Sequence, residues 1–228
     1  CSTRKSSAFE RRRKEITAWN HAQPHRKRGL AITPVKFGIS FTVTHLNQAG
    51  AFVLLYQDGT VQVNHGGTEM GQGVHTNIAA VASKELGLNP EQIRILPTST
   101  DKVPNTSATA ASCGTDLNGA AVKDACETLR KRLLPIAGLL LKEQTGRAPS
   151  PANIIFADGL VRDRKSPRAT VPFAAVARKA YLERISLSAT GFYATPGIDW
   201  DRQAGRGHPF HYFAYGAAAT ETRYVAIG

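Results

Sequence analysis

The sequence predicts an α+β (mixed α/β) fold in which β-hairpins and a mixed sheet pack with several helices. Two Asp-Gly pairs, at 58–59 and 158–159, each separate two runs of β-type residues, which is a strong hairpin pattern. Other segments carry apolar residues at helical spacing. Hairpins mixed with helices favour this class over a doubly wound parallel sheet. With 228 residues the chain is long enough to bury a core.

In the first half of the chain, a helix at 6–21 with Ser6 or Ser7 as its cap precedes a strand at 30–43 that Pro34 interrupts. Gly87 suits the end of a second helix. The remaining elements predicted here are a hairpin of 51–56 with 60–64, that helix at 75–88, a turn at 89–91 and a strand at 93–96.

In the second half, a long polar segment at 98–114 precedes a helix at 117–144, which Asp116 can cap. Pro135 should kink this helix or split it in two. The further predicted elements are a hairpin of 154–156 with 160–162, a helix from Pro172 to Arg184, a strand at 185–190, a loop at 191–207 and a long strand at 210–226, bulged at Gly216.

The charge is concentrated at the start of the chain. The net charge is +12, and residues 1–28 hold nine Lys and Arg against two Glu. Such a segment could bind nucleic acid or another anionic surface, or it could be an exposed helical connector that docks on an acidic neighbouring domain. No aromatic-interleaved platform accompanies the charges, so we favour a basic helical connector at 1–29, with the rest of the chain, 30–228, forming one domain.

Composition limits the remaining classes. No apolar run reaches the ~18–20 residues that a membrane span needs. Cys1, Cys113 and Cys126 have neither metal-ligand spacing nor a disulfide pattern, which fits a reducing cytoplasm. We therefore expect a cytoplasmic location, no contact with a membrane and no metal ligated directly by the protein. A buried, inert thiol is the favoured interpretation of Cys113.

A glycine-rich run, G-G-T-E-M-G-Q-G-V-H-T at 66–76, is the most informative stretch. It follows a strand pattern and opens a helix pattern, so close backbone approach and a helix start could together hold something anionic and flat. It is neither a dinucleotide fingerprint nor a P-loop. A tight strand-to-helix turn without a ligand remains open, and Glu69 is best interpreted as a turn residue.

Two further segments draw attention. The polar segment at 98–116 concentrates hydroxyls and small side chains just before a helix, as a pocket-lining loop would, although a flexible surface loop has the same composition. In the strand at 36–43, alternation places Phe37, Ile39, Phe41 and Val43 on one face, and periodicity alone predicts Phe41 to lie in the core.

Seven motifs together resemble, in order and spacing, the molybdenum-binding part of the xanthine dehydrogenase family, a group of molybdenum hydroxylases. They cover the chain from about Arg28 onward. The matching motifs are K-F-G-I-S-F-T at 36–42, L-N-Q-A-G at 46–50, G-G-T-E-M-G-Q-G at 66–73, P-N-T-S-A-T-A-A-S at 104–112, T-D-L-N-G at 115–119, S-A-T-G-F-Y at 188–193 and P-F-H-Y-F-A-Y-G at 209–216.

The resemblance implies a cofactor domain of the molybdenum-hydroxylase type and a role for each matched residue. The implied cofactor is a molybdopterin that carries molybdenum, and the implied substrate is a purine, hypoxanthine or xanthine, which the enzyme would oxidise to urate. The implied cofactor-binding residues are Gly71, Gln72, Ala111, Ser112 and Thr115. The implied substrate-binding residues are Phe41, Thr42, Leu46, Ala110 and Ala111, so the resemblance reverses the assignment of Phe41 to the core.

The chain also departs from the family pattern. Thr44-His45 stands where many relatives have a Pro-aromatic pair, and Cys113-Gly114 replaces residues that are often small and hydroxylic. The family's catalytic glutamate lies in a Gly-Glu-Pro-Pro motif and its substrate-orienting arginine in an Ala-Phe-Arg-Gly-Phe-Gly motif, and neither motif is present in these residues. We therefore assign no catalytic residue within this chain.

The chain is accordingly interpreted as a fragment of such an enzyme, inactive alone. Its expected partners are the purine and the remaining molybdenum, flavin (FAD) and 2Fe–2S domains. An aldehyde oxidase-like hydroxylase is the alternative within the same chemistry, although Phe41-Thr42 argues against it. A noncatalytic basic module that binds nucleic acid through residues 1–28 is the alternative from another class.

Overall fold

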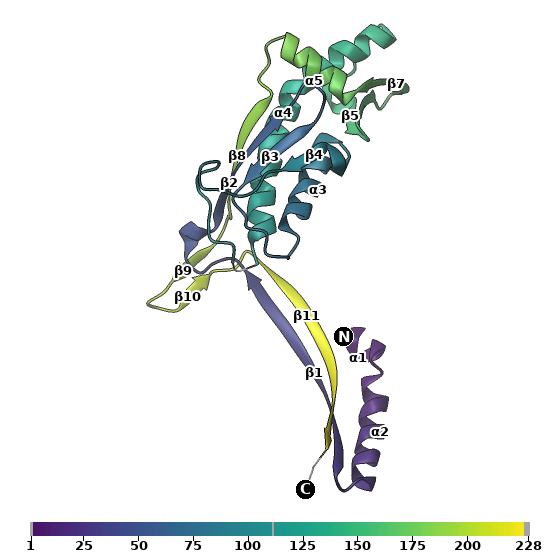
Figure 1. The fold of residues 1–228 in the computed structure, drawn as a ribbon, viewed down its shortest axis with the longest axis vertical. Helices are drawn as coiled ribbons and strands as arrows, with labels where there is room; N and C mark the ends of the chain where they lie inside the picture. The colour runs from purple at the N-terminus through teal and green to yellow at the C-terminus, as the bar shows by residue number, and fades with distance from the viewer. Residues whose placement is uncertain (1, 111, 226–228) are drawn as a thin grey trace. The chain divides into compact units, whose positions relative to one another are not determined.

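The computed structural model describes residues 2–110 and 112–225, and it divides into two compact units. A smaller unit comprises the chain up to Ile39 and from Tyr212 onward, and a larger unit comprises Ser40–His211 (Figure 1). These units divide the chain at other positions than residue 29, so the separate domain at 1–29 stays a prediction. Each unit is described by itself below.

The smaller unit is a two-stranded antiparallel ribbon with a helix along it. Strand β1 (Arg26–Ile39) pairs with β11 (Tyr212–Val225), while α1 (Ser2–Ser6) and α2 (Phe9–Ala22) precede the ribbon. Helix α2 packs against β1, burying Ile16 and placing the Trp19 ring 4.4 Å from the Arg28 guanidinium carbon. The prediction of one helix at 6–21 is wrong at its start, because Ala8 adopts a left-handed φ of 49° between the two helices.

Two details of the ribbon correct the sequence prediction. Strand β1 runs through Pro34 without interruption and ends at Ile39, before Ser40 adopts a φ of 143°. Gly216 pairs with Val35 in an unshifted register, so the expected bulge is absent from the described part of β11. The last position of the predicted strand, residue 226, lies outside the described residues.

The larger unit is built on a four-stranded mixed sheet in the order β4-β3-β2-β8. A hairpin joins β2 (Gln48–Leu55) to β3 (Val61–His65), as the Asp58-Gly59 pair predicted, and β8 (Ser188–Ala194) pairs with the other edge of β2. Helix α3 (Val74–Leu86) connects β3 to the parallel strand β4 (Ile93–Ile95). The mixed sheet of the predicted fold class is therefore confirmed.

A single long helix, α4 (Gly114–Thr145), packs against β2, β8 and α3. The packing on β8 is close: a Cβ on Gly191 would lie 2.0 Å from the carbonyl oxygen of Ala121. The helix continues through Pro135 as one element, so the predicted split does not occur. It also begins earlier than predicted, which places Asp116 in the first turn and makes Cys113 the N-cap in its stead.

The rest of the larger unit holds small elements. Strands β5 (Ile154–Ala157), β6 (Leu160–Asp163) and β7 (Ser166–Pro172) form an antiparallel sheet, in which the predicted Asp158-Gly159 hairpin is confirmed. Helix α5 (Phe173–Leu182) follows directly after Pro172. The remaining elements are the 3₁₀ turns η1 (Thr44–Leu46), η2 (Pro90–Gln92) and η3 (Pro151–Asn153), and a short hairpin of β9 (Asp199–Asp201) with β10 (Arg206–His208) inside the predicted loop.

Within the part of the chain that the structure describes, no helix combines the length and apolar character required to cross a membrane.

Candidate functional site

The glycine run forms the turn between β3 and α3, and Glu69 holds it together. The carboxylate of Glu69 accepts hydrogen bonds from the backbone N–H groups of Gly71 and Gly73, both at 2.9 Å, and of His75 at 3.0 Å. The bond from His75, followed by the bond from Gly73, lowers the pKa of Glu69 below its usual value. The start of α3 is thus capped by a carboxylate of the chain itself, so those N–H groups are not free for an anionic ligand.

Gln72 braces the same turn with both ends of its amide. Its Oε1 accepts from the Met70 N–H at 2.6 Å, and its Nε2 donates to the Thr68 carbonyl at 2.8 Å. Gly71 and Gly73 have φ angles of 96° and 79°, and no atom lies within 4 Å of where their Cβ atoms would stand. Their backbone therefore faces open space, as a ligand-contacting turn requires.

A buried histidine supports the turn from behind, and sequence reasoning missed it. The Nδ1 of His65 accepts from the Gly67 N–H at 3.0 Å, while its Nε2 lies 3.1 Å from Nδ1 of His75. Since Nδ1 is an acceptor, the neutral ring carries its proton on Nε2 and donates it to His75. Burial, then the nearby His75, lowers the pKa of His65 to about 4. Two histidines ten residues apart gave no signal of this pairing.

The polar segment at 98–113 is tied to the turn by hydroxyl groups. Thr98 Oγ1 donates to the Gly67 carbonyl at 2.7 Å, and Thr109 Oγ1 accepts from the Thr68 N–H at 2.9 Å. At the end of the segment, Cys113 is buried, and burial raises the pKa of its thiol to about 11. The burial of Cys113 is as predicted, whereas the inertness of its thiol stays a prediction that rests on the poor nucleophilicity of a protonated thiol.

A pocket of about 430 Å³ lies where the turn and this segment meet. It brings together four of the predicted site residues, Gln72, Ala110, Ser112 and Thr115. Gly71 lies beside it in the chain but does not line it, and Ala111 lies outside the described residues. The full lining comprises Met70, Gln72, Val74, Thr109, Ala110, Ser112, Gly114 and Thr115.

The donors of this pocket suit a ligand rich in hydrogen-bond acceptors. Thr109, Ser112 and Thr115 contribute hydroxyls, and the first turn of α4 has N–H groups without intrahelical acceptors. No Lys or Arg is among the lining residues, so affinity for an anion rests on dipoles and hydroxyls. Beneath the turn, Asn118 Nδ2 donates to the Gly114 carbonyl, while its buried Oδ1 has no partner among the described residues.

Three of the predicted substrate residues, Phe41, Thr42 and Leu46, lie on a separate loop, residues 40–47, held by Asn47. The buried amide of Asn47 accepts from the Phe41 N–H at 2.7 Å and donates toward the carbonyls of Phe41 and Thr44, at 2.9 and 3.2 Å. Phe41 and Leu46 are half-buried and Thr42 is exposed. The periodicity-based assignment of Phe41 to the core is therefore wrong, because the strand ends at Ile39 and alternation does not continue into the loop.

The pocket and this loop are linked but are not lined together. Ser107 Oγ donates to the Gln48 carbonyl at 3.2 Å, and Asn105 Nδ2 donates to Gln48 Oε1 at 3.0 Å, so the segment at 98–113 is attached to the residue after the loop. Phe41, Thr42 and Leu46 are not among the residues that line the pocket around Ala110. Asn47 was noted in the sequence only as part of the motif L-N-Q-A-G, and its role in holding the loop was not predicted.

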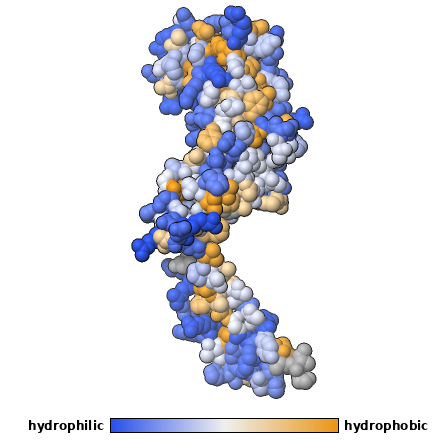
Figure 2. Space-filling view, turned by 90° about the vertical axis from the view of Figure 1, so that its left-hand side faces the viewer, coloured by the Kyte–Doolittle hydropathy of each residue, from blue (hydrophilic) through white to orange (hydrophobic). Residues whose placement is uncertain are grey.

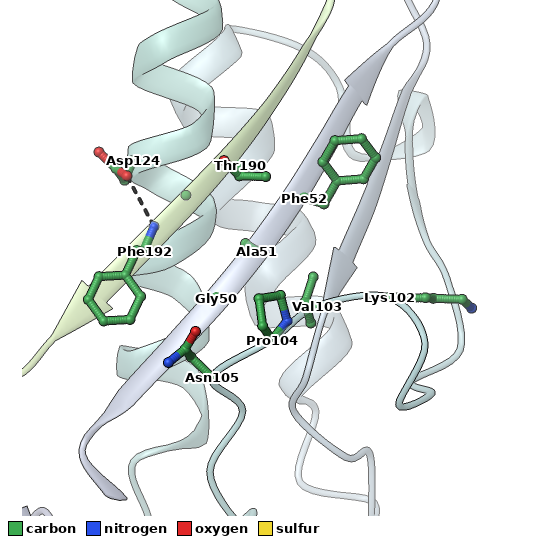
Figure 3. A pocket seen from close by; sticks show the side chains of 11 residues that line it. Gly50, Ala51, Phe52, Lys102, Val103, Pro104, Asn105, Asp124, Thr190 and Phe192 are labelled. Carbon is green, nitrogen blue, oxygen red and sulfur yellow. Dashed lines mark hydrogen bonds between the residues drawn. The ribbon is translucent and has the colours of Figure 1, made fainter. Parts of the chain in front are cut away.

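A larger hollow of about 660 Å³ lies elsewhere, between β2, β8 and residues 102–105 (Figure 3). Its lining includes Phe52 and Phe192 but none of the predicted site residues. Asp124 of α4 accepts a hydrogen bond from the Phe192 N–H at 3.1 Å, which occupies the one carboxylate in this lining (Figure 3). The carboxylate in this lining therefore has a structural role, and the lining residues do not form a cluster that indicates a catalytic or binding site.

Comparisons with known proteins identify the family and support the fold. Residues 2–224 match the model of a family described as the molybdopterin cofactor-binding domain. The chain is 46% identical over 216 residues to a xanthine dehydrogenase/oxidase of Felis catus and 45% identical over 216 residues to a xanthine dehydrogenase of Oryza sativa subsp. japonica. Each alignment covers 95% of this chain and 14% of the relative.

A solved structure shares the fold. The crystal structure of quinoline 2-oxidoreductase from Pseudomonas putida 86 superposes with a TM-score of 0.78 and 23% sequence identity, over 97% of this chain and 27% of that one. At this identity the similarity concerns the fold alone. The chain thus spans a small part of the proteins that it matches.

Proposed function

The chain belongs to the molybdopterin cofactor-binding domain family, and on that premise we propose that it forms one wall of the molybdopterin and purine site of a xanthine dehydrogenase. The whole enzyme would oxidise hypoxanthine and xanthine to urate. The observation that carries the proposal is the single pocket that gathers Gln72, Ala110, Ser112 and Thr115. These residues come from two segments that lie 40 positions apart in the sequence, and they meet at the starts of α3 and α4.

The residues of the pocket fit the cofactor by their chemistry. A molybdopterin offers ring nitrogens, carbonyl and phosphate oxygens, which accept hydrogen bonds from the hydroxyls of Ser112 and Thr115 and from the N–H groups at the start of α4. Gly71, with open space where a Cβ would stand, would let the turn approach the cofactor closely, and Gln72 would donate the amide hydrogen that its bond to Thr68 leaves over. When bound, the molybdenum cofactor supplies the oxidation chemistry.

The substrate would be held by different residues. The small side chain of Ala110 leaves room beside the cofactor, while the half-buried ring of Phe41 offers a face on which a purine can stack. Thr42 would donate or accept a hydrogen bond at the purine edge, and Leu46 would contribute apolar contact. The catalytic base and the FAD and 2Fe–2S domains would come from the remaining polypeptide, in a cytoplasmic protein.

The experiment uses the full-length protein that contains this chain. Purified protein should form urate from xanthine. Gln72→Ala should lower both the molybdenum content and the urate formation by tenfold or more, which corresponds to a loss of about 1.4 kcal/mol or more in the free energy of cofactor binding. Gln57→Ala, which removes an exposed glutamine in the β2–β3 turn, is the matched control and should change neither.

A second variant separates substrate from cofactor. Phe41→Ala should raise the KM for xanthine while molybdenum content stays at the wild-type level, because the ring contacts the purine and not the cofactor. Residues 1–228 alone should form no urate. Full molybdenum content in Gln72→Ala, or urate formation by the isolated chain, would contradict the proposal.

A further inference from the structure

The β1–β11 ribbon is an incomplete sheet. Among residues 2–110 and 112–225, β11 pairs with β1 alone, over fourteen residue pairs from Arg26–Val225 to Ile39–Tyr212. From Ala214 to Tyr224, the outer edge of β11 therefore has backbone N–H and C=O groups without a strand partner in the described part of the chain, and β1 has one such edge as well. Two-stranded ribbons are at best marginally stable in water, and long exposed edges are templates for further pairing.

The two faces of the ribbon differ, and only one of them is covered. Residues directly opposite in an antiparallel pair share a face. Leu30 and Ile32, with Ala217 and Ala219 near them on the same face, are half-buried along α2. The other face carries no charge between Gly29 and Phe37 or between Tyr212 and Tyr224, yet it is exposed. Its exposed members are Gly29, Ala31, Thr33, Val35, Phe37, Tyr212, Ala214, Gly216, Ala218, Thr220, Thr222 and Tyr224.

A long exposed strand face with almost no charged residue is unusual in a chain in which 20% of residues are charged. Tyr224 is 63% exposed, Val35 51% and Phe37 44%, and Figure 2 shows pale and orange residues on the surface of the unit that contains the ribbon. Apart from Lys27, which lies opposite Tyr224 at one end, this face is uncharged and partly aromatic, which is typical of a surface that another segment covers.

The two edges are not equivalent. Strand β1 has the features with which proteins protect edge strands, namely Pro34 and the lysines Lys27 and Lys36. Strand β11 has neither Pro nor Lys. Its charged residues are Glu221 and Arg223, and Glu221 is engaged in ion pairs with Arg12 and Arg28 of the same unit. By composition β1 is an edge strand, whereas β11 is a strand of the sheet interior.

We infer that the outer edge of β11 pairs with a further β-strand, supplied by the part of the same polypeptide that lies outside these 228 residues. The chain spans 14% of the relatives that it matches, so most of such a protein is available to supply that strand. The family model continues to residue 224, which makes β11 part of the conserved domain unit and not a peripheral extension. The inference does not depend on the proposed function.

The first test is residue-resolved amide hydrogen exchange on the full-length wild-type protein. An edge strand protects only every second N–H, whereas an interior strand protects all of them. In β11, consecutive amides from Ala214 to Tyr224 should all exchange slowly, by about a hundredfold or more relative to an exposed strand amide. In β1, slow and fast amides should alternate.

The second test uses proline, which removes an N–H. Ala218→Pro and Ala219→Pro occupy consecutive positions of β11, so one of them must remove an outward N–H, and both should lower the yield of soluble full-length protein severalfold. On β1, residue 36 directs its backbone N–H to the same edge of the strand as residue 34, so Lys36→Pro should be tolerated, whereas Phe37→Pro should not. This pair is the matched control for the general effect of placing a proline in a strand.

Two results would overturn the inference. Alternating fast and slow amides in β11, or normal yield of either β11 proline variant, would make β11 an edge strand in the whole protein. Protection of the outward β11 amides that disappears when the protein is diluted to monomers would assign the partner strand to a second copy of the chain.

Discussion

The glycine turn at 66–75 and the loop at 40–47 carry the two halves of the proposed site, yet they are held in different ways. Three side chains fix the turn: Glu69, Gln72 and His65 together bind six backbone groups of the turn and the start of α3. In the loop, the buried amide of Asn47 joins Phe41 to the 3₁₀ turn that follows, and the amide of Gln48 adds one exposed bond to the His45 carbonyl. The proposed cofactor residues Gly71 and Gln72 thus lie on a redundantly braced turn, and the proposed substrate residues of the loop lie on an element with one buried anchor.

This difference teaches where the site can vary. A turn held by three residues tolerates the loss of one, and its geometry toward a cofactor stays fixed. A loop held by one buried residue can change its outward side chains, such as Thr44 and His45, as long as the anchor remains. Loss of the anchor leaves both backbone polar groups of the half-buried Phe41 without their side-chain partner at once.

The largest effect is expected from Asn47→Ala. The variant leaves the N–H and the carbonyl of Phe41 without their side-chain partner, whereas the Thr44 carbonyl keeps the backbone N–H of residue 47 as a donor. The free energy of unfolding should fall by about 3 kcal/mol, because two polar groups lose their hydrogen bonds together. Thermal unfolding of the variant and wild type measures this change. In the full-length enzyme the same variant should raise the KM for xanthine.

Asn77→Ala is the matched control for that experiment. Asn77 lies in α3, is exposed and has one side-chain hydrogen bond, to Thr115 Oγ1, so its loss should change the free energy of unfolding by about 0.5 kcal/mol or less. Equal effects of the two variants would show that Asn47 is not the anchor of the loop.

The next largest decrease in the free energy of unfolding is expected on acidification, through His65 behind the turn. The pKa of His65 is about 4 in the folded protein, and the ordinary pKa of a histidine is 6.5. The unfolded chain therefore binds more protons between these values, and stability falls as the pH decreases through this window. Between pH 7 and pH 5 the expected loss is about 2 kcal/mol. Chemical denaturation at the two pH values measures it.

His65→Gln tests the source of that pH dependence. Glutamine can still accept from the Gly67 N–H but does not titrate, so the variant should lose less stability than the wild type between pH 7 and pH 5. The same slope in both proteins would exclude His65 as the responsible group.

The smallest effect is expected from Glu69→Gln. The amide keeps one acceptor oxygen but loses the charge at the start of α3 and part of its three N–H contacts. The melting temperature should fall less than in Asn47→Ala, because Gln72 and His65 still hold the turn. Glu127→Gln, which removes a surface ion pair with Lys123, is the control and should leave the melting temperature nearly unchanged. A larger fall than in Asn47→Ala would refute the redundancy of the turn.

Local signals in the sequence predicted much of the fold. The two Asp-Gly hairpins and the end of α3 at Gly87 were accessible because each depends on residues a few positions apart, and Gly87 adopts a left-handed φ of 68°. Strand β7 was missed because Ser166 and Pro167 begin a strand without apolar alternation. The break at Ala8 was missed because alanine rarely adopts a left-handed φ.

Several residues of the candidate site could be predicted from the sequence, but the contacts that bring them together could not. The pocket residues Ser112 and Thr115 were accessible through the matching motifs, and Gln72 through the glycine run. The contacts of His65 with His75 and of Asn47 with Phe41 were not, because a side chain that binds backbone around a turn leaves no periodic trace. Likewise, the capping of α3 by Glu69 depends on the exact curvature of the turn.

The ribbon also has a consequence for the order of folding. Arg26 is paired with Val225 and Ile39 with Tyr212, so β1 and β11 meet only across nearly the whole chain. Closing so long a loop is entropically costly and slow while residues 40–211 are disordered. Folding of that stretch into its own unit shortens the effective loop and brings the two strands into register. During synthesis β1 therefore emerges before β11 and stays without its partner strand until β11 is made. In that interval, Pro34 and the lysines of β1 would also protect it against pairing with other chains.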